Sequence, residues 1–252
     1  MESKQENDIH LAYKKLGETP LGCIERFRRE NTDFALAKIT YAGRLDPMAE
    51  GLLILLTNEK VNEKEKFLDL SKTYIVEILW GVETDTVDVL GLVTGSKDKT
   101  LEPTQVLSYL EKSTGKFEQE YPAYSSKPVQ GKPLFQWARE GKIDEIIIPK
   151  HEVEIFDAKF LNRSDVKGGE VIKIIEEKVS LVAGDFRQAE VLEKWRILLD
   201  GVKAKDFYID KIELRVSSGF YVRQFVSDMA KNFGSSATTF HIKRTQVGDY
   251  KI

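Results

Sequence analysis

The 252-residue sequence predicts an α/β or α+β protein built around a sizeable mixed sheet. Segments rich in β-branched residues or alternating between apolar and polar residues predict strands, and amphipathic segments that predict helices lie between them. The hydrophobic fraction of 41% and the charged fraction of 31% are ordinary for a soluble globular protein, so these elements can enclose a core.

Four elements are predicted in the amino-terminal half. Residues 20–29 predict a helix, because their apolar residues share one face. The short apolar run 51–56 predicts a buried strand, and residues 73–82 have strand composition. Residues 103–115 predict a helix that begins at a proline and is closed by a glycine.

The carboxy-terminal half predicts a strand over residues 211–219 and a helix over residues 220–234. Residues 164–206 predict a pair of amphipathic helices inserted between two strands, the second starting at Asp185 with Gln188 in capping-box spacing. The apolar stripe of this hairpin fits either packing against the rest of the domain or the surface for a protein partner.

Composition excludes several classes of protein. The longest unbroken apolar run has five residues, far fewer than a membrane-spanning helix needs, and the first residues lack the pattern of a signal peptide. Cys23 is the only cysteine, which excludes an internal disulfide framework and fits a reducing compartment. We therefore expect one cytoplasmic domain, a monomer, without membrane contact.

Asp46 is the first candidate for chemistry. It lies between a Gly-Arg-Leu run and Pro47, directly ahead of the apolar strand. An aspartate in such a loop is often a turn residue that bonds its own backbone. The alternative is a nucleophile or general base, which needs a shaped pocket and a cation to keep it ionised. The local pattern leaves both interpretations open.

The acidic stretch 83–88 suggests a metal site at first sight, with carboxylates at Glu83, Asp85 and Asp88. However, it lacks the glycine and the carboxylate ladder of an EF-hand, and no phosphate-binding loop accompanies it. The three histidines are scattered without zinc-ligand spacing. We therefore predict no metal and no nucleotide cofactor.

Two further segments suggest RNA. Residues 120–142 interleave aromatic and basic side chains, which fits stacked bases and phosphates, or equally a core with a solvated rim. Tyr221 and Arg223 are expected on one face of an extended segment before a helix. The net charge of −3 argues against a polyanionic partner, but residues 215–252 hold six Lys/Arg against two Asp/Glu.

Taken in order, five motifs resemble the TruB family of tRNA pseudouridine synthases. They are Gly43-Arg44-Leu45-Asp46-Pro47 with Gly51; Lys72-Thr73-Tyr74 followed by Gly81, Thr84, Asp85, Thr86 and Asp88; Pro122-Ala123-Tyr124-Ser125 with Gly131-Lys132; Gly219-Phe220-Tyr221-Val222-Arg223; and Lys243-Arg244-Thr245-Gln246-Val247-Gly248. The resemblance runs from about residue 10 to the carboxy terminus, without the helical hairpin.

The resemblance implies a mixed, mostly antiparallel central sheet flanked by helices. It also implies an isomerase that converts a uridine of the tRNA T-loop, at position 55, to pseudouridine without a cofactor or metal. Asp46 takes the place of the catalytic aspartate, which attacks or deprotonates the ribose. Arg223 would pair with Asp46, and Tyr74 would stack on the target base.

The remaining site residues follow from the same resemblance. Tyr221 and Ile242 would complete the walls of the base pocket. The residues expected to contact RNA are Tyr41, Arg44, Lys72, Lys127, Lys132 and Arg244. Tyr41 stands where the family usually has a histidine, and a tyrosine can stack there. The chain stops at Ile252, so we expect no PUA domain, the module that many members append to grip tRNA.

Two other functions fit parts of this pattern. One is a non-catalytic RNA chaperone that uses the same fold to help tRNA reach its shape. The other is a pseudouridine synthase for a different stem-loop RNA. The joint presence of Asp46, Tyr74, Tyr221 and Arg223 favours an enzyme, because a chaperone has no need for all four side chains.

Overall fold

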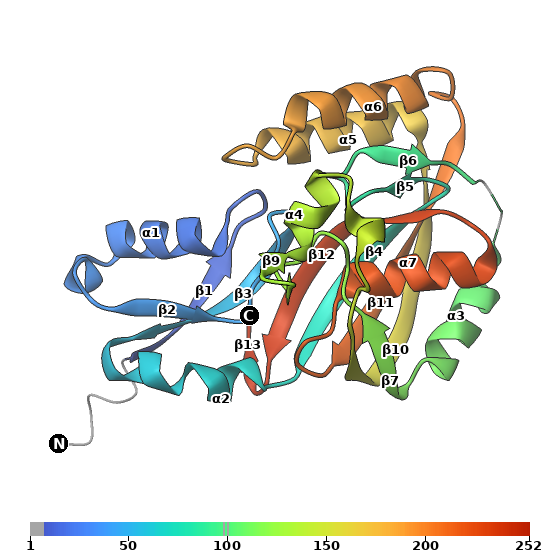
Figure 1. Ribbon diagram of the computed structural model, residues 1–252. Helices are drawn as coiled ribbons and strands as arrows, with labels where there is room; N and C mark the ends of the chain where they lie inside the picture. Colours follow the sequence, from blue (N-terminus) through green and yellow to red (C-terminus); the bar gives the residue numbers. More distant parts are fainter. Residues whose placement is uncertain (1–7, 98, 100) are drawn as a thin grey trace.

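The computed structural model describes residues 8–97, 99 and 101–252 of the chain. Its centre is a long, twisted sheet with helices at both faces and at one end (Figure 1). Across the sheet the strands are β1 (Ile9–Lys14), β3 (Ala49–Thr57), β12 (Ala237–Val247), β4 (Lys72–Trp80), β11 (Asp206–Val216), β10 (Lys150–Lys167) and β7 (Gly115–Glu120). Two more strands join its edges, β2 (Ile39–Ala42) beside β3 and β13 (Tyr250–Lys251) beside β12.

Every pair of neighbouring strands in this sheet is antiparallel except β3 and β12, which run parallel. The mixed, mostly antiparallel sheet predicted from the sequence is therefore confirmed. Two small hairpins lie outside it, formed by β5 (Glu83–Thr84) with β6 (Val93–Gly95) and by β8 (Pro128–Val129) with β9 (Lys132–Pro133).

The helices are α1 (Pro20–Glu30), α2 (Lys64–Leu68), α3 (Pro103–Lys112), α4 (Leu134–Arg139), α5 (Gly168–Ser180), α6 (Gln188–Asp200) and α7 (Val222–Phe233). Short 3-10 turns cover Thr32–Phe34, Asn58–Glu63 and Ile143–Glu145. None of the helices in the described ranges is long and apolar enough to cross a membrane.

The two faces of the sheet carry separate cores. On β4, Val76 and Ile78 pack with α3 and α7, whereas Leu79 packs with α5 and α6. On β11, Leu214 belongs to the first core and Ile209 to the second. This division follows from the alternation of side chains along a strand.

Strand β3 is buried on both sides, which explains its unbroken apolar sequence. Leu52 and Ile54 pack with Phe67 of α2, whereas Leu53 and Leu55 pack with α1. The strand that leaves the Asp46 loop is thus clamped between two helices. A loop attached to so rigid an element is well suited to hold a reactive side chain.

Several predicted boundaries were wrong: the strand predicted over residues 211–219 is β11, Asp206–Val216, and two helices also differ. Helix α3 ends at Lys112, and Gly115, expected to close it, instead starts β7 with a φ of 103°. Helix α7 begins at Val222, so Arg223 lies in the first turn of a helix and not in an extended segment. Tyr221 keeps an extended backbone as the residue before the helix.

The hairpin formed by α5 and α6 also differs in detail from its prediction. Strand β10 continues to Lys167, so residues 164–167 are strand. Helix α6 is preceded by Arg187, whose backbone is left-handed, and Asp185 is not its amino-terminal cap. The apolar stripe, including Trp195, packs against the rest of the domain, which decides between the two interpretations of that stripe.

This packing places the hairpin against the segments that build the site. Its buried side chains contact Val82, Val89 and Leu90, which flank the acidic stretch 83–88. The same core includes Met48, two residues after Asp46. Figure 1 shows α5 and α6 lying across one end of the sheet, beside β5 and β6.

Candidate active site

Asp46 lies in the tight loop between β2 and β3. Gly43 opens this loop with a φ of 78°, a left-handed conformation that favours glycine. The loop is held from inside the protein by Arg244, which is 1% exposed. Its guanidinium donates to the carbonyls of Gly43 at 3.0 Å and Leu52 at 2.8 Å. The local chain path is therefore set by a buried cation and not by the turn residues alone.

The Asp46 carboxylate is paired with the Arg223 guanidinium. Arg223 Nε donates to Asp46 Oδ2 at 2.8 Å, across 177 residues of sequence. The arginine side chain is 5% exposed, whereas the aspartate side chain is 37% exposed. The pair therefore presents its carboxylate to solvent while its cation stays inside the protein.

Arg223 also fixes two other segments. Its Nη1 donates to the carbonyl of Thr86 at 2.7 Å, and its Nη2 donates to the carbonyl of Tyr124 at 3.2 Å. Burial by itself lowers the pKa of this guanidinium, but the carboxylates of Asp46 and Asp88 outweigh it, so the pKa is raised. Arg223 thus remains a cation and joins the Asp46 loop, the acidic stretch and the 121–125 loop.

Asp88 is a residue of this site to which the sequence assigned no role. Its Oδ2 lies 3.8 Å from Arg223 Nε, on the buried side of the guanidinium. Its Oδ1 accepts hydrogen bonds from the Thr86 hydroxyl at 2.8 Å and the Leu90 amide at 2.9 Å. Burial raises the pKa of Asp88 to about 6 despite the nearby arginine. The available signal was its place as the last residue of the motif that begins at Lys72, but a carboxylate in a loop gives no indication of its burial.

Tyr74 and Ile242 lie in the same core as Leu45, the residue before Asp46. Both are buried, at 8% and 5% exposure. Neighbouring strands β4 and β12 supply them. The structure therefore brings these two predicted pocket residues to one face.

Tyr221 is held at the other side of Arg223 by Gln119, which is 1% exposed. The Gln119 amide exchanges two hydrogen bonds with the Tyr221 backbone, at 3.0 Å and 2.8 Å. The Tyr221 ring packs edge-on against Tyr121, with centroids 5.6 Å apart. Burial raises the pKa of Tyr221, and the Asp46 charge adds to that rise. Gln119 was not predicted, since a glutamine in a strand of charged residues carries no visible signal.

Two residues predicted to contact RNA are buried structural cations. Lys72 is 6% exposed, and its ammonium donates to the carbonyls of Leu68 and Leu70. Burial lowers its pKa to about 8, and Arg244 contributes to the shift. The Arg244 guanidinium donates to the carbonyls of Gly43 and Leu52, as described above. Both cations are buried and donate to backbone carbonyls, so this geometry does not favour their predicted contact with RNA, which stays a prediction.

The other predicted RNA contacts lie nearer to solvent. Arg44 is exposed beside Asp46. The Lys127 ammonium lies 4.9 Å from the centroid of the Tyr121 ring. The Lys132 ammonium lies 3.6 Å from the centroid of the Trp137 ring and forms an ion pair with Glu140 at 2.7 Å.

Tyr41 is placed differently from the Asp46 group. It packs with the cluster of β3 and α1 that includes Leu53 and Leu55. The Lys64 ammonium lies 5.5 Å from the centroid of its ring. The structure thus brings together Asp46, Arg223 and Tyr221, and it has Tyr74 and Ile242 in the core that includes Leu45. Tyr41 lies in a separate cluster.

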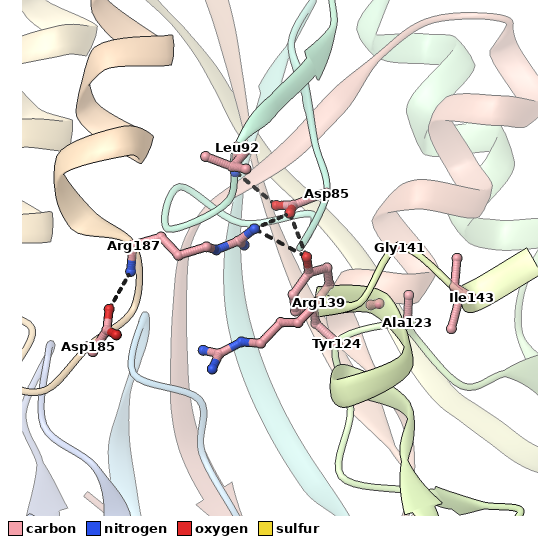
Figure 2. A pocket seen from close by; sticks show the side chains of 10 residues that line it. Asp85, Leu92, Ala123, Tyr124, Arg139, Gly141, Ile143, Asp185 and Arg187 are labelled. Atoms are coloured by element: carbon pink, nitrogen blue, oxygen red, sulfur yellow. Dashed lines mark hydrogen bonds and ion pairs between the residues drawn. The ribbon is translucent and has the colours of Figure 1, made fainter.

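A second carboxylate–guanidinium pair adjoins the first. Arg187 Nη1 lies 2.9 Å from Asp85 Oδ2, and the Tyr124 hydroxyl donates to the same oxygen at 2.7 Å. Figure 2 shows Arg187 reaching from the hairpin to Asp85 and Tyr124 at the wall of a cavity of about 550 Å³. Arg139 and Ile143 line its opposite wall.

Comparison with solved structures identifies the class of fold. A chain in "Crystal Structure of a Cbf5-Nop10-Gar1 Complex" superposes with a TM-score of 0.58 at 12% identity, covering 97% of this chain and 50% of that one. A chain in "Structure of H/ACA RNP bound to a substrate RNA containing 2'-deoxyuridine" gives 0.56 at 11% identity, covering 97% and 48%. The predicted pseudouridine synthase fold is thereby confirmed.

Sequence comparison identifies the family. A family model described as "TruB family pseudouridylate synthase (N terminal domain)" matches residues 31–177. The chain belongs to this family.

Three curated relatives named tRNA pseudouridine synthase B give the measure of similarity. That of Thermosipho melanesiensis is 28% identical over 240 residues, covering 95% of this chain and 64% of the relative. That of Malacoplasma penetrans is 29% identical, covering 87% and 77%. That of Caldicellulosiruptor saccharolyticus is 35% identical over 156 residues, covering 62% and 52%. The chain thus spans a little under two thirds of the Thermosipho protein.

Proposed function

We propose that this chain isomerises uridine to pseudouridine in the T-loop of tRNA, at position 55, with Asp46 as the catalytic carboxylate. The observation that carries the proposal is the Asp46–Arg223 pair, in which a buried cation holds an accessible carboxylate. Family membership and the relatives named tRNA pseudouridine synthase B support the substrate.

The reaction breaks the bond between N1 of uracil and C1′ of the ribose, turns the base, and joins C5 to C1′. A proton leaves C5 and a proton is added at N1, so reactant and product have the same atoms. The carboxylate can start this sequence by attacking the ribose or by removing a ribose proton. Both routes need the carboxylate oriented and within reach of the ribose, which are the two conditions that the bond from Arg223 and the exposure of Asp46 provide.

The target base must leave its stack to reach Asp46, at a cost of a few kcal/mol. Tyr74 and Ile242 offer apolar surface for the flipped base, and Tyr221 closes the side next to Arg223. Such stacking contacts, worth about 1–3 kcal/mol per base, offset part of the cost of unstacking. Arg44, Lys127 and Lys132 are the cations best placed for phosphates, since they lie closer to solvent than Lys72 and Arg244.

Pseudouridine mapping of unmodified tRNA incubated with the purified protein tests the proposal. We expect one new pseudouridine, in the T-loop, without added cofactor. Modification of a different stem-loop would support pseudouridine formation but overturn the proposal that the T-loop is the substrate. Binding of tRNA without any new pseudouridine would overturn the enzyme and favour the chaperone.

A further inference from the structure

The loop that joins α5 to α6, residues 181–187, lies against the active site. On one side Leu181 meets Gly17, where an added Cβ would lie 2.3 Å from the Leu181 carbonyl oxygen. The Gly17 amide in turn donates to the carbonyl of Pro47 at 2.9 Å, the residue after Asp46. On the other side Arg187 reaches Asp85 and Tyr124. The loop therefore contacts two of the segments that build the site.

This loop has a defined conformation. The Gln188 side chain accepts from the Phe186 amide at 2.9 Å and donates to the carbonyl of Gly184 at 2.6 Å. Asp185 accepts from the Arg187 amide at 3.2 Å. Arg187 itself has a φ of 62°, which is uncommon for a residue with a side chain. A strained backbone conformation that is held by its neighbours occurs often at functional sites, so the Arg187 side chain is a candidate for a functional role.

The Arg187 guanidinium makes three contacts with the site. Its Nη1 lies 2.9 Å from Asp85 Oδ2 and 3.2 Å from the Tyr124 hydroxyl. Its Cζ lies 5.1 Å from the centroid of the Tyr124 ring. Asp85 is otherwise bonded to the Tyr124 hydroxyl and the Leu92 amide. Arg187 thus supplies the positive charge that balances Asp85 and donates to the Tyr124 hydroxyl (Figure 2).

The backbone of Tyr124 and of Thr86, the residue after Asp85, holds Arg223. The carbonyl of Tyr124 accepts from Arg223 Nη2, and the carbonyl of Thr86, next to Asp85, accepts from Arg223 Nη1. Arg223 Nε is then directed at Asp46. A guanidinium is planar and rigid, so the positions of two carbonyls determine where its third donor points.

We infer that Arg187 is a positioning residue for the catalytic pair. It acts through Asp85 and Tyr124 on the orientation of Arg223, and through Arg223 on Asp46. The role rests on the proposed function, and it gives the α5–α6 hairpin a part in the reaction beyond packing.

Arg187→Gln is the test, with Arg196→Gln as its matched control. Arg196 lies on α6 of the same hairpin and pairs with Glu176 at 2.7 Å on the surface, so both variants lose one ion pair. We expect Arg187→Gln to lower kcat by about 10- to 100-fold with KM for tRNA changed less than about threefold, because a small misplacement reduces turnover more than binding. Arg196→Gln should leave both constants unchanged.

A merely structural role would give a different pattern. Arg187→Lys retains a cation for Asp85 and should recover part of kcat, which a general loss of folding would not allow. Combining Arg187→Gln with Tyr124→Phe should lower kcat little beyond the worse single variant, since both changes break one path. A rise of KM alone would mean that Arg187 binds RNA, and fully multiplicative effects would mean that it acts independently of Tyr124. Either result overturns the inference.

One measurement does not depend on turnover. The Nε–H resonance of Arg223, assigned by its loss in Arg223→Lys, reports on its bond to Asp46 in the free protein. We expect faster exchange of this proton with solvent in Arg187→Gln and no change in Arg196→Gln. An unchanged exchange rate in Arg187→Gln overturns the inference even if the wild-type protein modifies no tRNA, whereas an inactive wild type with the expected exchange overturns only the proposed function.

Discussion

The two neighbouring ion pairs of this site have almost the same contact distance, but they differ in which partner is the more buried. The Asp46–Arg223 contact is 2.8 Å, with the arginine 5% and the aspartate 37% exposed. The Asp85–Arg187 contact is 2.9 Å, with the arginine 24% and the aspartate 18% exposed. In the first pair the cation is committed to the protein and the carboxylate is open. In the second, the carboxylate is the more enclosed partner.

This difference fits a catalytic role for the carboxylate of the first pair and a structural role for that of the second. Asp46 accepts one hydrogen bond from Arg223, so part of its carboxylate is available to a substrate. Asp85 accepts from the Tyr124 hydroxyl and the Leu92 amide in addition to Arg187, so its lone pairs are largely used. A contact distance alone does not distinguish the two roles, but the number of donors around each carboxylate does.

Asp46→Asn gives the largest expected effect. The amide keeps the shape and one acceptor for Arg223 but loses the nucleophilic and basic oxygen, so turnover should fall by at least roughly 10³-fold. Because the Asp46 carboxylate is 37% exposed and Asp88 still balances the buried Arg223, the free energy of unfolding should change by less than about 1 kcal/mol. Single-turnover formation of pseudouridine and thermal unfolding measure the two quantities. RNA binding should be nearly intact. Normal turnover would exclude Asp46 as the catalytic group and remove the contrast between the pairs.

Asp85→Ala should show the opposite balance. It leaves the Leu92 amide and the Tyr124 hydroxyl without their acceptor and Arg187 without its counter-charge, which should cost about 2 kcal/mol of stability. Turnover should fall less than in Asp46→Asn, since the carboxylate that we propose to be catalytic remains. Denaturant unfolding followed in parallel with turnover tests this order. A variant as stable as the wild type would show that the second pair is not a support.

Much of the first pair was predictable from the sequence, and little of the second was. Asp46 and Arg223 lie in short motifs whose residue types are needed for the chemistry, and those motifs are visible in a linear sequence. Arg187 lies in a polar loop of a hairpin outside the motifs. Its contact with Asp85 arises because the apolar stripe around Trp195 packs the hairpin beside that loop, which requires the tertiary structure.

Burial sets two of the predicted RNA contacts apart from the others. The resemblance implies that Lys72 and Arg244 contact RNA, and cationic side chains are usually solvated. Both instead donate to backbone carbonyls in loops: Lys72 to that of Leu70 and Arg244 to that of Gly43. Such carbonyls need donors when buried, but their positions depend on loop conformations that a sequence does not specify.

A smaller effect is expected from the protonation of Asp88, behind Arg223. Burial raises the pKa of Asp88 to about 6 from its ordinary value of 3.8. The folded protein therefore binds this proton more tightly than the unfolded chain, so the contribution to stability is complete below pH 3.8 and is lost as the pH rises through about 6. Relative to Asp88→Asn, the wild type should gain roughly 1 kcal/mol of unfolding free energy between pH 7 and pH 5.

Denaturant unfolding of both proteins at the two pH values measures this gain. Protonation of Asp88 also removes the second negative charge near Arg223, so Asp46 becomes the remaining counter-charge of that guanidinium among the carboxylates of the described residues. A difference that stays constant with pH would mean that Asp88 is ionised in both states.

The smallest expected effect concerns Arg44, the exposed cation beside the open carboxylate. If the open side of the first pair faces the substrate, Arg44→Gln should weaken binding of a T-arm RNA by a few-fold, because one phosphate contact contributes little on its own. The slope of log K against log salt should become less steep by about one. Arg215→Gln is the matched control, since Arg215 is exposed on the opposite side of β11 from buried Leu214 and Val216. Equal losses in the two variants would mean that RNA is attracted by overall charge and not by a surface centred on Asp46. A loss confined to Arg44 would place the RNA on the face where the carboxylate is open and the second pair is covered by the hairpin.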